Sequence, residues 1–168
     1  MFRAIDDFVA VWKDESAITA KVFATLTDTS LSQSIHNDHR TIVRLAWHLT
    51  QTIPEMLGKL GLELHGPGEH DRVPHSAKAI HDAYTEAAAS IAPALDVARW
   101  TDAELETKRP MYGEEWTVGF TLRAFILHQA HHRGQITVLM RQAGLRVPGI
   151  YGPAKEDWAV YGMPEPLI

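Results

Sequence analysis

Two histidines one helical turn apart are the strongest chemical signal in the sequence. His128 and His132 are separated by four positions, so on a helix their directions differ by only about 40°. Phe125 and Leu139 point within about 60° of His128, which predicts that both imidazoles face the core. Neighbouring side chains of this kind can hold one metal ion between them. Buried histidines satisfied by hydrogen bonds are the structural alternative.

A metal site needs more than two ligands, and the chain contains ten histidines. His48 lies at the border of the apolar stripe of a helix that we predict over 39–60. Facing helices of a bundle often share a metal site, so His48 could meet the helix that carries the pair. Of the other seven, His65, His70 and His75 lie in a polar loop with Glu69 and Asp71, and His36 and His39 lie beside a predicted helix cap. His81 lies on the polar side of its predicted helix, and His131 lies at the edge of an apolar stripe.

Several kinds of chemistry are excluded by what the sequence lacks. It contains no cysteine, which excludes disulfides, zinc–thiolate sites, iron–sulfur clusters and a cysteine nucleophile. Gln129 stands where the helical zinc-protease motif needs a glutamate as general base. There is no glycine-rich phosphate loop and no Gly-x-Ser-x-Gly elbow. The net charge of −5, with 16 scattered basic residues, argues against binding of nucleic acid.

The spacing of apolar residues predicts the helices that would position these histidines. Apolar side chains recur every three to four positions, which predicts helices over 2–26, 39–60, 76–98 and 117–143. Asp38 is the expected N-cap of the second helix, and Pro54 and Pro93 predict kinks in the second and third. No strand-like alternation stands out. The sequence therefore predicts an all-α, up-down four-helix bundle, with a single domain over 1–168.

The residues after the fourth helix are expected to form an ordered tail. Residues 145–168 contain Tyr151, Trp158 and Tyr161. Three large aromatic side chains in a free tail would leave much apolar surface in water. We therefore expect the tail to pack across the bundle.

The sequence also predicts a cytoplasmic protein without membrane contact. Its longest stretch free of Asp, Glu, Lys and Arg is the ten residues Leu45–Pro54, which is too short to span a bilayer. Asp6 and Asp7 stand where a signal peptide needs an apolar segment.

The residues around the histidine pair resemble the DinB-like (DinB/YfiT) family of small bacterial metal-binding bundles. The run His-Gln-Ala-His-His-Arg-Gly-Gln over His128–Gln135 carries the resemblance most specifically. The other matching segments are Ala46–Leu49, Ile53–Met56, Val138–Gly144 and Pro148–Pro153. The resemblance implies an up-down four-helix bundle, often dimeric, in which three histidines hold a divalent metal ion.

By position, the ligands that this resemblance implies are His48, His128 and His132. Many relatives have Glu where this chain has Gln129, so an orienting role of that carboxylate would be reduced here to a neutral hydrogen bond. We expect Arg133 and Gly134 to be structural, with Arg133 pointing away from the metal face and Gly134 permitting close helix approach. Gln135 is expected to point inward about one turn below the ligands, where it is a candidate partner of a ligand or substrate.

Three neutral imidazoles would leave at least one coordination position open, which is typical of a catalytic site. Nitrogen ligands suit zinc, nickel, iron, cobalt or copper, and we expect zinc or nickel. Such an ion lowers the pKa of a bound water or thiol.

Three functions fit this site. The first, known in the family, is a metal-dependent transferase that activates a low-molecular-weight thiol for attack on an electrophilic small molecule. The second is hydrolysis or isomerisation by bound hydroxide, with Glu55, Glu114 or Glu115 as the base. The third is a non-catalytic metal-binding protein of the stress response. The resemblance also implies a homodimer, for which an outward-facing Trp47 or Phe120 could supply an apolar patch.

Overall fold

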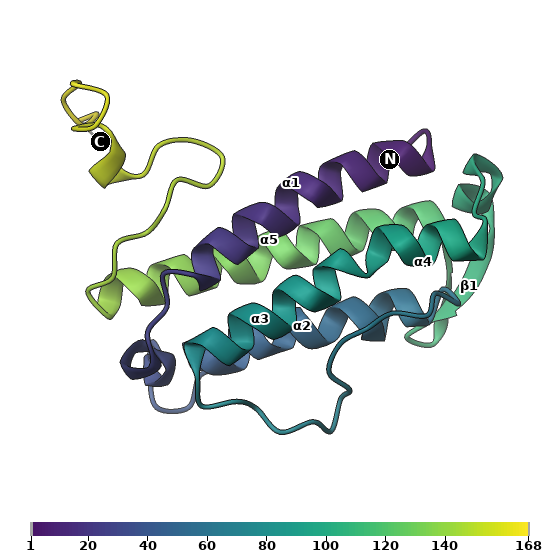
Figure 1. Ribbon diagram of the computed structural model, residues 1–168, viewed down its shortest axis with the longest axis horizontal. Coiled ribbons are helices and arrows are strands. Elements are labelled where there is room, and N and C mark those ends of the chain that lie inside the picture. Colours follow the sequence, from purple (N-terminus) through teal and green to yellow (C-terminus); the bar gives the residue numbers. More distant parts are fainter. Residues whose placement is uncertain (1, 168) are drawn as a thin grey trace.

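The computed structural model describes residues 2–167 and is a bundle of long helices with a small hairpin at one end (Figure 1). The long helices are α1 (Ile5–Phe23), α2 (Ile42–Gly58), α3 (Ala77–Ala89), α4 (Ile91–Ala98) and α5 (Val118–Gln142). The shorter elements are η1 (Asp28–Ser32), η2 (Asp102–Glu106), β1 (Lys108–Met111), β2 (Glu114–Thr117) and η3 (Lys155–Asp157). In the part of the chain just described, no helix is long and apolar enough to cross a membrane.

The predicted all-α four-helix bundle is confirmed, with differences at the helix ends. Thr41, and not Asp38, caps α2, because its hydroxyl accepts a hydrogen bond from the backbone N–H of Arg44. The third predicted helix is divided at Ser90 into α3 and α4. Pro93 lacks the N–H that would bond to the carbonyl four residues earlier, so the helical ladder is weakened where the break occurs.

The hairpin between α4 and α5 was not predicted. β1 and β2 pair antiparallel, with Lys108 opposite Thr117. Tyr112 and Gly113 form the turn with φ angles of 52° and 87°, as a tight two-residue hairpin requires. Each strand has only four residues, which is too short for an alternating pattern to stand out.

The direction of α3 differs from the strict alternation of an up-down bundle. The backbone N–H of Ala77 donates to Asp28, and that of Ile42 donates to the carbonyl of Gln33, so α2 and α3 both begin where α1 ends. The two helices are therefore parallel, and the connection over 59–76 returns along the bundle (Figure 1). This connection is long enough to cover the roughly 25 Å length of α2.

The second helix is buried on more sides than its apolar stripe suggested. It contacts α5, α3 and η1. Trp47 was expected to face outward, but only 6% of it is exposed. A helix with neighbours on three sides buries residues beyond a single stripe, so Trp47 is not available as a surface patch.

A buried ion pair joins α1 to α5. The guanidinium of Arg133 is 1% exposed and lies 2.5 Å from the carboxylate of Glu15. It also donates to the hydroxyl of Thr19, at 2.9 Å, and to that of Tyr151. Arg133 therefore points toward α1, away from the histidine pair as predicted, but into the core and not into solvent.

The tail buries residues on the bundle only at its beginning, and further on Glu156 forms an exposed ion pair with Arg141 of α5. Val147 and Pro148 are buried, whereas Tyr151 and Tyr161 are 69% and 63% exposed. Figure 1 shows the chain after α5 extending away from the helices. The expectation that the tail aromatics pack across the bundle is therefore wrong for the rings of Tyr151 and Tyr161, although the Tyr151 hydroxyl contacts Glu15 and Arg133. Trp158 is half-buried.

Candidate metal centre

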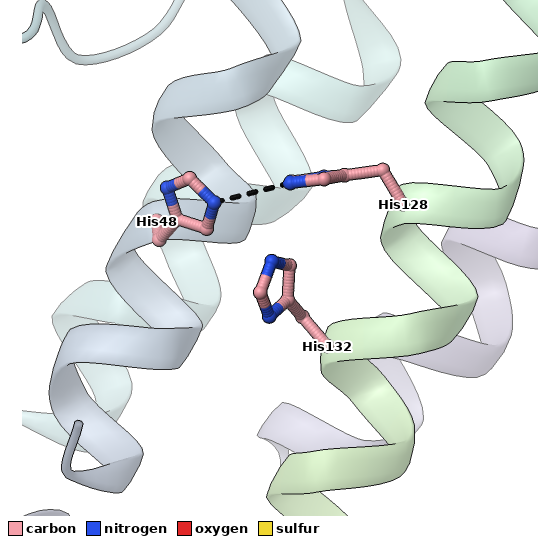
Figure 2. A group of neighbouring side chains, drawn as sticks. All are labelled: His48, His128 and His132. Atoms are coloured by element: carbon pink, nitrogen blue, oxygen red, sulfur yellow. Dashed lines mark hydrogen bonds between the residues drawn. The ribbon is translucent and has the colours of Figure 1, made fainter. Parts of the chain in front are cut away.

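Three imidazole rings from two facing helices converge at the centre of the bundle's α2–α5 interface. Figure 2 shows His48 on α2 facing His128 and His132 on α5. Nε2 of His48 lies 3.1 Å from Nε2 of His128. One nitrogen from each ring lies within 4.8 Å of the other two, and all three rings are half-buried. The structure thus brings together the three histidines named from the sequence, here called the histidine triad, and positions them to hold a metal ion.

The donor atoms of the triad fit a first-row transition metal. A tetrahedral zinc ion binds imidazole nitrogen at about 2.0–2.1 Å, so two of its ligand atoms lie about 3.3 Å apart. The 3.1 Å between the two facing Nε2 atoms is close to that separation. Only one hydrogen can lie between them, so at least one lone pair faces the space between the rings. Within residues 2–167 this group of potential ligands contains no carboxylate, so an ion held by the three rings would have a coordination position open to another molecule.

The environment of the triad keeps its rings neutral. Burial lowers the pKa of His48 to about 4, and repulsion from Arg40 and from His132 when that ring is protonated acts in the same direction. Burial also lowers the pKa of His128 to about 4, and repulsion from His132 and His48, when either is protonated, lowers it further. The pKa of His132 is lowered by burial, although its hydrogen bond to Gln135 opposes the change. Neutral imidazole is the form that binds metal, so the triad is ready for an ion at neutral pH.

These pKa values predict how the stability of the metal-free protein depends on pH. An unfolded histidine titrates near 6.5, whereas His48 and His128 titrate near 4 in the folded state. Between these values the unfolded chain binds more protons, so the free energy of unfolding falls as the pH falls from about 6.5. Urea unfolding in a chelator should therefore show a lower midpoint at pH 5 than at pH 7.

The control for this prediction is the double variant His48→Gln/His128→Gln. Asp and Glu carboxyls titrate mostly at lower pH, so the interval from pH 7 to pH 5 isolates histidines. The double variant should show a smaller loss of stability over that interval than the parent protein. An equal loss in both would contradict neutral, buried rings.

Gln135 fixes the orientation of one triad member. Its side-chain oxygen lies 2.7 Å from Nδ1 of His132, and its nitrogen lies 3.2 Å from Nε2 of His131. An amide oxygen can only accept, so Nδ1 of His132 carries the hydrogen and Nε2 keeps a free lone pair. Gln135 does this from an exposed position, although we expected it to point inward. By contrast, Nδ1 of His128 is buried and has no hydrogen-bond partner in residues 2–167.

Replacing Gln135 with alanine is expected to weaken metal binding. Loss of a partner that orients a ligating histidine typically reduces metal affinity by about 10–100-fold. Titration with zinc against a chromophoric chelator would measure the change. Gln135→Glu should keep most of the affinity, because a carboxylate also accepts the Nδ1 hydrogen. Gln142→Ala, an exposed change on the same helix, is the matched control; a loss of affinity there equal to that of Gln135→Ala would contradict the assignment.

Gln129 links helices, and in residues 2–167 its side chain forms no hydrogen bond with the triad. It is fully buried. Its amide nitrogen donates to the carbonyl of Leu49 and the hydroxyl of Thr52, and its oxygen accepts from the hydroxyl of Tyr84. Because Leu49 follows His48 in α2, Gln129 fixes the part of α2 that carries this histidine. The neutral hydrogen bonds expected at position 129 are present, but their partners are backbone and hydroxyl groups.

Of the three candidate bases named from the sequence, Glu55 is the one that acts on the triad. Its negative charge raises the pKa of His48, against the larger effect of burial. The hydroxyl of Tyr112 donates to Glu55 at 2.8 Å. Glu114 and Glu115 are exposed on β2, within the hairpin.

Two further expectations near the site concern helix packing and the surface. A Cβ at Gly134 would meet open space, so the expectation that Gly134 permits close helix approach is wrong. Phe120 is exposed as expected, and its ring packs edge-on against Trp116 with 4.9 Å between centroids. The seven histidines outside the triad are not part of the group of potential ligands in the described chain.

Comparison with known proteins assigns the chain to a family. The sequence profile of the DinB family matches residues 1–166. The chain belongs to the DinB family. The YrdA protein of Bacillus subtilis (strain 168), which is described as uncharacterized, is 43% identical to this DinB-family chain over 168 residues, covering all of both chains.

Solved structures of DinB-like proteins have the same fold. The crystal structure of a DinB-like protein from Bacillus cereus ATCC 10987 is 43% identical and matches with a TM-score of 0.85, covering 90% of this chain and 100% of that one. The DinB-like protein YjoA from Bacillus subtilis is 15% identical, with a TM-score of 0.67 over 88% of this chain and 99% of that one. The second likeness concerns the fold alone. The DinB fold thus keeps its shape while most of its sequence changes.

Proposed function

We propose that the histidine triad binds a divalent transition metal ion, zinc or nickel, and that the protein is a metal-dependent transferase. The observation that carries this proposal is the convergence of three neutral, half-buried imidazoles within 4.8 Å, with no fourth protein ligand among residues 2–167. The reaction joins a low-molecular-weight thiol to an electrophilic small molecule. When bound, the ion supplies a positive charge that favours the ionised form of a thiol.

The reaction balances without a redox partner. The thiol loses its proton, its sulfur forms a bond to the electrophilic carbon, and the leaving group departs with the electron pair of the bond that breaks. The leaving group and the proton together make up the second product. Because the chain contains no cysteine, the thiol comes from a co-substrate.

Residues of the chain orient the rings and favour their neutral form. Gln135 holds His132 with its Nε2 lone pair toward the other rings. Burial disfavours protonation of all three rings, so protons do not compete for the nitrogen lone pairs at neutral pH. A pocket of about 510 Å³ that includes His132 adjoins the triad, and its volume is in the range for small-molecule sites.

A conjugation assay tests the transferase. Protein prepared without a histidine tag and loaded with zinc or nickel is mixed with chlorodinitrobenzene and each of several cellular thiols, and the thioether product is measured by absorbance. At least one thiol should react faster with the parent protein than with His128→Ala. Equal rates for both proteins with every thiol would exclude the transferase.

The effect of the Glu55 charge on His48 favours a second candidate, hydrolysis or isomerisation with a bound hydroxide. The charge of Glu55 acts on His48, and Tyr112 donates to Glu55, so a carboxylate is held near the site. A rate that needs metal and Glu55 but no thiol would favour this candidate. Stoichiometric metal with neither activity would favour a non-catalytic metal-binding protein.

A further inference from the structure

A pocket beside the triad combines an apolar wall with an arginine. Leu45, Val138 and Leu139 supply apolar surface, and His39 and Arg40 also line the pocket. His132 lines the same pocket, so a molecule bound there reaches the triad. The volume of about 510 Å³ suits a small molecule.

The charge of this pocket is not neutralised by the protein. No carboxylate is among its lining residues, and Arg40 has no ion pair or side-chain hydrogen bond within residues 2–167. Asp38, the acid nearest to it in sequence, faces His36 at 3.7 Å. Leu45 lies in the first turn of α2, where the helix dipole adds positive potential.

Arg40 is also close enough to act on the reacting site. Arg40 and His132 line the same pocket, so a group held by Arg40 lies beside the triad. Arg44, in the first turn of α2, does not line the pocket. The two arginines therefore differ in the property that matters here, which is access to the pocket.

We infer that this pocket binds the anionic end of a substrate, a carboxylate that Arg40 holds while the apolar part of the molecule lies on Leu45 and Leu139. The reactive end of the molecule then meets the triad. This inference rests on the proposed transferase, since it names the charge of one of its two substrates. The carboxylate could be carried by the thiol or by the electrophile, and the two sources share the same recognition chemistry.

The thiol arm of the test uses cobalt-loaded protein. Sulfur-to-cobalt absorption is titrated with mercaptopropionate and with mercaptopropionamide, which has the same length and no charge. Mercaptopropionate should bind about tenfold more tightly, which corresponds to ~1.4 kcal/mol. Arg40→Gln should remove this preference, and Arg44→Gln should keep it. High salt should shrink the preference, because Arg40 is exposed.

The electrophile arm compares chloronitrobenzoate with chloronitrobenzamide in the conjugation assay. A lower KM for the acid, lost in Arg40→Gln and kept in Arg44→Gln, would assign the carboxylate to the electrophile. No preference for the acid in either arm, or a preference that persists in Arg40→Gln, would overturn the inference. In that case metal-dependent conjugation with neutral compounds would leave the transferase standing.

A third measurement separates failure of the pocket from failure of the transferase. Metal-free protein is titrated with hexanoate and with hexanamide, and backbone amide shifts are followed by NMR. Hexanoate should shift the amides of Val138 and Leu139 at lower concentration than hexanamide, and Arg40→Gln should abolish the difference. A preference for hexanoate without any conjugation activity would exclude the transferase and support the anion site. Equal shifts by both compounds would sink the anion site.

Discussion

We expect the parent protein to retain a metal ion through purification and the variant His128→Ala to lose it. The change deletes one of three neutral donors and leaves Nε2 of His48 without the ring that it faces at 3.1 Å. Loss of a residue that only hydrogen-bonds to a metal ligand reduces metal affinity by about 10–100-fold, and loss of the ligand itself should reduce it more. Elemental analysis of protein made without a histidine tag measures the result directly.

The matched control for this prediction is His131→Ala. His131 is adjacent to the triad, with its ring 4.9 Å from that of His132, but it is exposed and outside the group of potential ligands. Metal should stay bound in this variant. Zinc at a hundred times its Kd should stabilise both the parent and His131→Ala by ~2.7 kcal/mol, and this stabilisation should raise the Tm of both proteins. Metal retained by His128→Ala, or lost equally from both variants, would contradict the triad as the binding site.

The geometry of the pair could be predicted because it depends on one helix. Residues four positions apart share a face whatever the rest of the fold does, so the inward direction of His128 and His132 follows from local geometry. His48 lies on another helix. It lies at the edge of the apolar stripe of that helix, so the spacing alone does not determine whether its ring faces the core. The family resemblance, and not the spacing, identified His48 as the third ligand.

Features that depend on distant contacts could not be predicted. The position of Arg133 on the helix predicts only that it points away from the triad. Whether that direction leads to solvent or to a buried carboxylate depends on Glu15, which lies 118 positions earlier in the chain. The parallel direction of α2 and α3 likewise depends on the path of the connection over 59–76, and a Gly- and Pro-rich composition does not determine a path.

Replacing Glu15 with glutamine should have the largest effect on stability. Arg133 is 1% exposed and the Glu15 side chain 11% exposed, so the variant leaves a buried guanidinium without its counter-charge. Breaking a buried ion pair in this way costs about 3–5 kcal/mol. Domains are stable by only about 5–15 kcal/mol, so urea unfolding should show a large fall in the free energy of unfolding. Glu156→Gln, which breaks an exposed pair with Arg141, should change much less.

A double variant distinguishes the ion pair from simple packing at the same place. In Glu15→Gln/Arg133→Met neither partner keeps a charge, so the penalty of an unpaired guanidinium disappears. The double variant should therefore be more stable than Glu15→Gln alone. If the effects of the two replacements simply add, the free energy of unfolding does not depend on the pairing, and shape alone would connect α1 to α5. Tyr151→Phe, which removes the hydroxyl that contacts both partners, should lower stability more in the parent than in the double variant, where that hydroxyl no longer bonds to a charged group.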